Sequence, residues 1–393
     1  MDLSCADRTK NVKPSVTLAV SARAAELKAQ GIDIISLSTG EPDFDTPENI
    51  KAAAIKAIDG GQTKYPPVDG TPALKQAIVD KLKRENHLDY DLNQIIVSVG
   101  AKQVMYNICQ ALLNPGDEVV IPAPCWVSYP AMVALSEATS VIVETDIQHH
   151  FKISAEQLEK AITPKTKLFL INSPSNPSGA VYSPSELHEI AEVLLRHPHV
   201  YIASDDIYEH IYWADSPFQN LVNVCPALKD RTIVVNGVSK AYAMTGWRIG
   251  FAAAPAAITA VMKKIQSHST SGACSIAQAA ATEALAGPQN SVEKMCLAFK
   301  QRHDYVLDAI NSIDGLKVLP CDGAFYAFIH AQPVIDRLNL ASDVELAEYL
   351  INKANVALVP GSAFSAPGYL RLSFAADQET LEKAIQRIHA ALT

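Results

Sequence analysis

The residues with the clearest chemical potential are a lysine and an arginine eight positions apart, Lys240 and Arg248. They follow a β-branched run at residues 232–235, a pattern typical of a buried strand. Burying a lysine ammonium among small and apolar residues is costly, but an amine that forms an imine with a carbonyl avoids that cost. The fixed fork of arginine donors suits a phosphate. A lone lysine is usually just solvated, so this interpretation depends on the other residues.

Polar or aromatic groups follow five expected strands at the point where each strand ends. The strands are expected at residues 95–99, 118–121, 167–171, 200–203 and 232–235. The groups that follow them are Gly100-Ala101-Lys102, Trp126, Asn176, Asp205 with Tyr208, and Lys240. In an open parallel sheet, ligands bind beyond the carboxyl ends of the strands. We therefore expect these groups to converge on one cleft.

Pyridoxal phosphate carries both an aldehyde and a phosphate, so it fits a reactive lysine beside an arginine. The triplet Gly100-Ala101-Lys102 is expected to open a helix, whose free backbone N–H groups and dipole attract phosphate. In isolation, an ordinary glycine turn is the simpler interpretation of this triplet.

Four further side chains could hold the ring of such a cofactor. Trp126 could stack on it, and Asp205, partly desolvated at a strand end, would keep its charge beside a protonated pyridine nitrogen. Tyr208 and Asn176 could form hydrogen bonds with the phenolic oxygen of the ring. The alternatives are a core tryptophan, an aspartate that caps a helix and a turn asparagine.

A substrate carboxylate could bind Arg371, which strand alternation places on the same face as Tyr369 and Ser373. Gly40 would let that carboxylate approach the backbone closely. A solvated strand arginine is the alternative interpretation.

The elements that must position these residues alternate between β-branched runs and helical patterns, as in a parallel α/β sheet. Further strands are expected at residues 141–144, 248–253, 324–329, 357–360 and 369–374, and helices at 102–113, 292–310, 343–353 and 377–391. We predict an α/β fold with a mostly parallel seven-stranded sheet between helices. The predicted parts are an N-terminal segment (1–45) that joins the small domain, a large domain (46–290) and a small α+β domain (291–393).

Composition excludes several classes of protein. The hydrophobic content of 48% is that of an ordinary core-forming chain, and a net charge of -9 without a basic cluster argues against a nucleic-acid partner. Seven scattered cysteines indicate free thiols in a reducing compartment and no metal framework. The N-terminus lacks a signal-peptide pattern, and Pro255 interrupts the longest apolar segment. We expect a cytoplasmic protein without a membrane span.

Several segments resemble the motifs of the class I pyridoxal-phosphate-dependent aminotransferases, which have fold type I. They are SLSTGEPDFDTP (36–47), NSPSNPSGAVYS (172–183), SDDIYEH (204–210), the segment 237–250 and YLRLSFA (369–375). They occur in the order of that family and span nearly the whole chain. TKYPPVDGTPALK (63–75) and GEPDFDTP (40–47) resemble the bacterial aspartate aminotransferase branch most.

The resemblance implies a role for each residue. Lys240 would form the imine and later move a proton, with Asp205 on the pyridine nitrogen. The implied cofactor-binding residues are Tyr65, Gly100, Ala101, Lys102, Trp126, Asn176, Asp205, Tyr208, Ser239, Lys240 and Arg248. The implied substrate-binding residues are Gly40, Trp126, Asn176 and Arg371. Tyr65 matches a tyrosine that reaches the phosphate from a second subunit, which implies a homodimer.

The implied reaction is ping-pong transfer of an amino group from an L-amino acid, most simply L-aspartate, to a 2-oxo acid such as 2-oxoglutarate. Three positions depart from the pattern. Gly237 stands where some branches have a phosphate-binding serine, and Asp206 replaces a glutamate. Asn11 stands where the prephenate-accepting branch often has arginine, and no arginine for a distal carboxylate can be located. Dicarboxylate and prephenate specificity therefore stay open.

Three alternatives remain. The first is different chemistry on the same cofactor: an aromatic, alanine, methionine or prephenate aminotransferase, or a β-lyase. The second is a non-catalytic regulator, although residues 1–35 are too short for a DNA-binding segment. The third is a nucleotide-binding oxidoreductase or a hydrolase, which the lack of GxGxxG, GxxxxGK and GxSxG motifs makes a poor fit.

Overall fold

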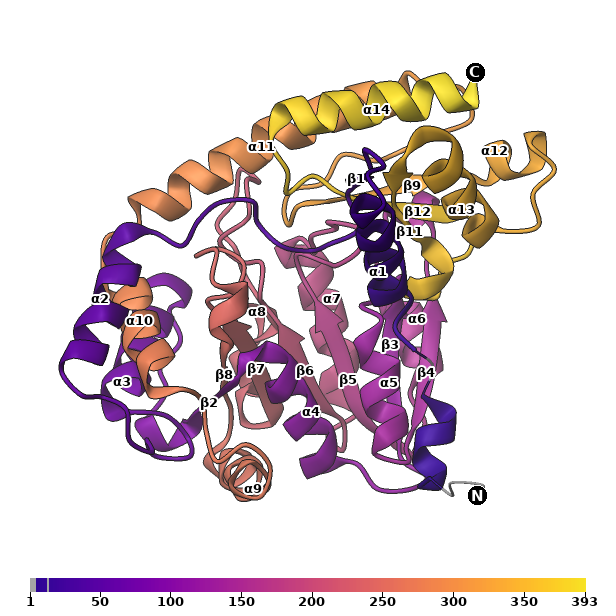
Figure 1. The fold of residues 1–393 in the computed structure, drawn as a ribbon. Helices are drawn as coiled ribbons and strands as arrows, with labels where there is room; N and C mark the ends of the chain where they lie inside the picture. The colour runs from indigo at the N-terminus through magenta and orange to yellow at the C-terminus, as the bar shows by residue number, and fades with distance from the viewer. Residues whose placement is uncertain (1–4, 13) are drawn as a thin grey trace.

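The computed structural model describes residues 5–12 and 14–393, and a seven-stranded sheet forms its centre (Figure 1). The strand order is β2-β8-β7-β6-β5-β3-β4. The strands are β2 (Ile95–Val99), β3 (Glu118–Ala123), β4 (Thr139–Glu144), β5 (Thr166–Asn172), β6 (Tyr201–Asp205), β7 (Thr232–Gly237) and β8 (Ile249–Ala253). Six of these strands run in one direction, and β8 runs opposite to them. The predicted α/β class and the mostly parallel seven-stranded sheet are confirmed.

Helices cover both faces of this sheet, as its apolar strands require. On one face, β-strand residues such as Ile121 and Val235 pack against Met105 of α4 (Gly100–Leu112) and Met262 of α9 (Ala256–Ser267). On the other face, Phe169 and its neighbours pack against α7 (Pro184–Arg196). The remaining helices of this part are α2 (Glu48–Asp59), α3 (Pro72–Asn86), α5 (Ser128–Leu135), α6 (Ala155–Ala161), α8 (Leu221–Val224) and α10 (Ser275–Ala286).

The sheet topology brings the predicted strand ends to one edge. Strands β2, β3, β5, β6 and β7 share one direction, so their carboxyl ends lie together. Because β8 runs the opposite way, its first residue lies at this same edge. The predicted strand at 248–253 begins one residue later because Arg248 has a left-handed backbone, with φ of 58°. That conformation ends the preceding turn and leaves the Arg248 side chain at the edge.

The C-terminal part begins with the long helix α11 (Asn290–Asn311) and contains a three-stranded antiparallel sheet, β11-β12-β9 (Figure 1). Its strands are β9 (Tyr326–His330), β11 (Val359–Pro360) and β12 (Tyr369–Ser373). The helices are α12 (Gln332–Arg337), α13 (Asp343–Ala354) and α14 (Gln378–Leu392). The single strand expected at 357–360 is two strands, because β10 (Val356–Ala357) pairs with a different partner from β11.

That partner of β10 is β1 (Ile35–Ser36), which lies parallel to it after helix α1 (Val16–Ala29). This pairing supports the predicted association of the N-terminal segment with the C-terminal part, although the domain boundaries themselves stay predictions. Across the described ranges, no helix combines the length and apolar character needed to cross a bilayer.

Candidate active site

A cavity of about 350 Å³ lies at the carboxyl edge of the central sheet. Most of the predicted site residues line it: Gly40, Ala101, Lys102, Trp126, Asn176, Asp205, Tyr208, Ser239, Lys240 and Arg248. Gly100 and Arg371 contact members of this set from just outside the cavity. The expected convergence of strand ends therefore brings one set of polar groups together.

Lys240 follows β7 and points its amine toward the N-terminal segment. Its Nζ donates a hydrogen bond to the carbonyl oxygen of Gly40 at 2.6 Å. Burial, reinforced by the nearby positive charge of Arg371, lowers the pKa of Lys240 to about 8. A lysine with this pKa is partly neutral near pH 7, as a nucleophilic amine must be.

Asp205 ends β6 and is only 4% exposed. The Tyr129 hydroxyl donates to its Oδ2 at 2.5 Å, and the backbone N–H of Ile207 is 3.4 Å from Oδ1. Burial raises the pKa of Asp205 to about 6, although the Tyr129 hydrogen bond opposes this rise. Turns follow Asp205, and the next helix begins only at Leu221, so the helix-cap interpretation is wrong.

Arg248 lies against the first residue of α4. A Cβ atom added to Gly100 would be 2.3 Å from Nη2 of Arg248, and Gly100 has a φ of 78°. Glycine is therefore required here by both sterics and backbone conformation. A Cβ on Gly250 would lie 2.1 Å from the backbone nitrogen of Ala101, so β8 approaches the start of α4 just as closely. Together these contacts place an arginine beside the free N–H groups of a helix start, an arrangement that suits an anion.

Lys102 and Trp126 form another side of the cavity. Nζ of Lys102 lies 5.0 Å from the centre of the Trp126 ring, and burial together with the charge of Arg248 lowers the pKa of Lys102. The Trp126 ring meets Tyr129 edge-on, with ring centres 5.2 Å apart and an interplanar angle of 88°. Trp126 is partly buried and faces the cavity, so it is not a core tryptophan.

Arg371 is 2% exposed, which excludes the solvated-arginine interpretation. Its Nη1 donates to Oδ1 of Asn176 at 2.9 Å, and its Nη2 donates to the carbonyl oxygen of Ser38 at 2.5 Å. Its Nε is buried without a hydrogen-bond partner among the described residues. A Cβ on Gly40 would be 2.1 Å from the Tyr326 hydroxyl oxygen, so glycine at this position makes room for a tyrosine of β9.

Four participants were missed by the sequence analysis: Ser38, Tyr129, Asn172 and Tyr326. The Tyr326 hydroxyl lies 2.8 Å from that of Tyr208, and Nδ2 of Asn172 donates to the carbonyl oxygen of Asp205 at 2.8 Å. Position gives a usable signal for Tyr129, three residues after Trp126, and for Asn172, the first residue after the strand predicted at 167–171. Ser38 and Tyr326 reach the site through long-range contacts that no local pattern encodes.

Tyr65 and Asn11 do not line this cavity. Tyr65 is 94% exposed, and Asn11 ends an exposed 3₁₀-helix, Asp7–Asn11, that contacts α5. Gly237 faces Ile249 so closely that a Cβ would lie 2.9 Å from the carbonyl oxygen of that residue. This contact gives a steric reason for glycine in place of serine.

Asp206 is buried behind the site. Its carboxyl accepts hydrogen bonds from the Ser204 hydroxyl and from Nδ2 of Asn220, each at 2.7 Å. Burial raises the pKa of Asp206 to about 8. The side chain is therefore anchored away from Asp205 by its own partners.

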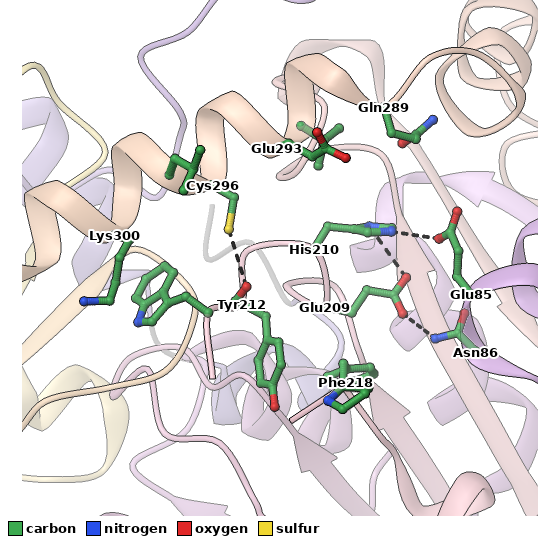
Figure 2. Close-up of a pocket in the computed structure, with 14 residues that line it drawn as sticks. Glu85, Asn86, Glu209, His210, Tyr212, Phe218, Gln289, Glu293, Cys296 and Lys300 are labelled. Carbon is green, nitrogen blue, oxygen red and sulfur yellow. Dashed lines mark hydrogen bonds and ion pairs between the residues drawn. The ribbon is translucent and has the colours of Figure 1, made fainter. Parts of the chain in front are cut away.

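A second cavity, of about 670 Å³, lies between α11 and the segment after Tyr208 (Figure 2). Figure 2 shows the ring of His210 beside both Glu85 and Glu209, and these three groups could in principle hold a metal ion. However, the buried ammonium of Lys81 bonds to Glu209 and lies 3.6 Å from Glu85. This ammonium supplies the positive charge that the carboxylates need, so we infer no metal site here.

The family model "Aminotransferase class I and II" matches residues 32–388. The chain is 52% identical to the aspartate/prephenate aminotransferase of Nitrosomonas europaea over the full length of both chains. It is 50% identical to the aspartate/prephenate aminotransferase of Cereibacter sphaeroides, covering 98% of this chain and 97% of that relative.

Solved structures agree with these sequence matches. The aspartate aminotransferase from Rhizobium meliloti superimposes with a TM-score of 0.95 at 46% identity, covering 99% of each chain. The aspartate aminotransferase from Thermus thermophilus with maleate gives a TM-score of 0.94 at 41% identity, covering 99% of this chain and 100% of that one. The predicted resemblance, fold type I and enzyme class are confirmed: the chain belongs to the class I and II aminotransferase family.

Proposed function

We propose that this enzyme uses pyridoxal phosphate to transfer the amino group of L-aspartate to 2-oxoglutarate. The observation that carries the proposal is a lysine with a lowered pKa, Lys240, in a cavity that also holds a buried carboxylate, Asp205, and an anion-binding corner. The names of the relatives, aspartate and aspartate/prephenate aminotransferases, support the choice of substrate.

The residues of the cavity fit the cofactor. The glycine-lined corner made by Arg248, Gly100, Ala101 and Ser239 suits its phosphate, since a larger residue at position 100 would fill that corner. Asp205 is an acceptor for a protonated ring nitrogen, and Tyr208 is a donor for the ring oxygen. When bound, pyridoxal phosphate supplies a carbonyl for amine exchange and a ring that withdraws electrons from the substrate Cα.

Each of the main side chains of the cavity would have a separate chemical role. Lys240 would hold the cofactor until the amino donor displaces it, and its freed Nζ would then take the proton from the substrate Cα and deliver it to the cofactor carbon. Asp205, when ionised, would keep the ring nitrogen protonated. Arg371 binds the α-carboxylate with Asn176, and its unpartnered Nε is one donor available for this.

The second carboxylate of aspartate needs a cation of its own, which the sequence alone did not identify. Lys102 lines the cavity, and its Nζ lies over the Trp126 ring. We assign Lys102 to this carboxylate, in addition to or in place of the phosphate contact expected from the sequence.

A panel of amino donors with 2-oxoglutarate tests the proposal directly. We expect L-aspartate to give the highest kcat/KM, with a keto acid and glutamate as products. Release of ammonia would indicate a β-lyase instead. Prephenate is the most relevant alternative acceptor, because it appears in the names of the relatives considered above.

The role of Lys240 has its own test. Lys240→Ala should abolish turnover and the visible absorption of covalently bound cofactor, whereas Lys264→Ala, near the end of α9, should change neither. An active, coloured Lys240→Ala enzyme would contradict the assignment.

A further inference from the structure

One side chain connects two walls of the candidate active site. Tyr129 lies in the first turn of α5, is 2% exposed and lines the cavity. Its hydroxyl donates to Oδ2 of Asp205 at 2.5 Å, and its ring meets that of Trp126 edge-on. No motif in the sequence identified this residue.

Asp205 depends on this contact more than on any other. Its other carboxylate oxygen has only the longer contact with the backbone N–H of Ile207, at 3.4 Å. Burial favours the neutral carboxyl, and the hydrogen bond from Tyr129 is the strongest influence that opposes it. A donor that keeps one oxygen fixed also leaves the other free for a ligand, as supporting residues around functional sites commonly do.

We propose that Tyr129 is a positioning residue, which fixes the Asp205 carboxylate and the Trp126 indole relative to each other and so presets both for a bound pyridine ring. The inference rests on the proposed function, because it requires pyridoxal phosphate as the ligand. Tyr129 would thus strengthen cofactor binding through Asp205 and Trp126, without itself having to contact the cofactor.

The test compares two ligands on the cofactor-free protein. One is pyridoxal phosphate, and the other is its 1-deaza analogue, in which a C–H group replaces the ring nitrogen. Tyr129→Phe keeps the ring against Trp126 and removes only the hydroxyl. Because hydrogen bonds to charged groups are the strong ones, we expect the Kd for pyridoxal phosphate to rise about tenfold or more. The Kd for the analogue should change less than about twofold, since Asp205 has no ring N–H to bind there.

The matched control is Tyr182→Phe, which removes the hydroxyl of another buried tyrosine, one that accepts a hydrogen bond from the backbone N–H of Ile153. It should leave the ratio of the two Kd values unchanged. In an Asp205→Ala background, Tyr129→Phe should have no further effect on this ratio, because the two residues act as a unit.

Three results would overturn the inference. Tyr129→Phe could bind both ligands as tightly as the unchanged protein, or lose affinity for both equally, which is the signature of a merely structural role. If the phenylalanine variant does not fold, 3,5-difluorotyrosine at position 129 keeps the shape and strengthens the donor, and an unchanged Kd ratio would be the contrary result. Failure of the unchanged protein to bind pyridoxal phosphate would instead reject the proposed function itself.

Discussion

Lys240 has the two properties that a reactive amine needs: access to a cavity and a pKa lowered to about 8. Only the neutral amine attacks an aldehyde, so the rate at which the cofactor-free protein captures pyridoxal phosphate should follow the neutral fraction. Because a group with a pKa near 8 loses its proton as the pH rises through 8, the rate should increase up to that pH and then level off.

Stopped-flow absorbance between pH 6 and about 9.5 measures this rate, with free Nα-acetyl-lysine as the reference amine. The reference should keep accelerating beyond pH 9, because an unperturbed lysine has a pKa of about 10.4. A rate for the protein that rises in parallel with the reference would show that the pKa of Lys240 is not lowered.

If Lys102 binds the second carboxylate of aspartate, it should affect which substrate the enzyme prefers. Lys102→Met keeps most of the side-chain length and removes the charge near Trp126. We expect kcat/KM for L-aspartate to fall about tenfold to a hundredfold, because a charged hydrogen bond contributes about 1.5–3 kcal/mol. For L-alanine, which lacks the second carboxylate, the change should stay below about threefold.

Lys264→Met serves as the control for a charge removed outside the cavity. Equal losses for aspartate and alanine, together with weaker cofactor binding, would return Lys102 to the phosphate role expected from the sequence.

Among the elements, α3 and the ends of β6 and β7 are joined by a buried ion network. Glu209 accepts hydrogen bonds from Lys81, from Nδ2 of Asn86 and from Nδ2 of Asn236, the latter two at 2.6 Å. Glu209 directly follows Tyr208, and Asn236 precedes Lys240 by four positions. The network therefore fixes two chain segments that carry site residues.

Lys81→Met leaves the buried Glu209 carboxylate without its ammonium partner. We expect the free energy of unfolding in urea to fall by about 3–5 kcal/mol, the usual cost of breaking a buried pair from one side. Lys83→Met, which removes an exposed lysine near Asp89, should cost less than about 1 kcal/mol. Adding Glu209→Gln to Lys81→Met should recover part of the loss, and no recovery would argue that packing dominates at Lys81.

Helices and strands whose apolar residues recur with a regular spacing could be predicted from the sequence. Most residues of the candidate site could be predicted too, because they follow such strands. The strands before Gly100, Asp205 and Lys240 are short apolar runs, and parallel topology alone brings their ends together. Ser38 and Tyr326 could not be predicted, because their place depends on how the N-terminal segment and β9 pack across the sheet edge. Helical and strand periods describe one element at a time, whereas these contacts join segments hundreds of positions apart.

At the scale of the whole molecule, the exposed side chain of Tyr65 bears on how two copies of the chain assemble. In the single chain this tyrosine is 94% exposed and lies on a surface hollow with residues 270–275, apart from the cavity that holds Lys240. An exposed aromatic side chain of this kind fits the homodimer implied by the sequence, in which Tyr65 would complete the site of the partner subunit. We propose this arrangement, which requires that neither subunit has a complete site alone.

Mixing two defective variants tests the shared site. Tyr65→Ala and Lys240→Ala should each form dimers with little activity, the first through weak cofactor binding and the second through loss of the reactive amine. When the two are unfolded and refolded together, half of the dimers should be hybrids, and each hybrid has one site that contains both Lys240 and Tyr65. Activity should therefore recover to roughly a quarter of that of the unchanged protein, provided that the sites act independently. Refolding each variant alone controls for the treatment, and a mixture no more active than the sum of its parts would place Tyr65 outside the active site of the partner.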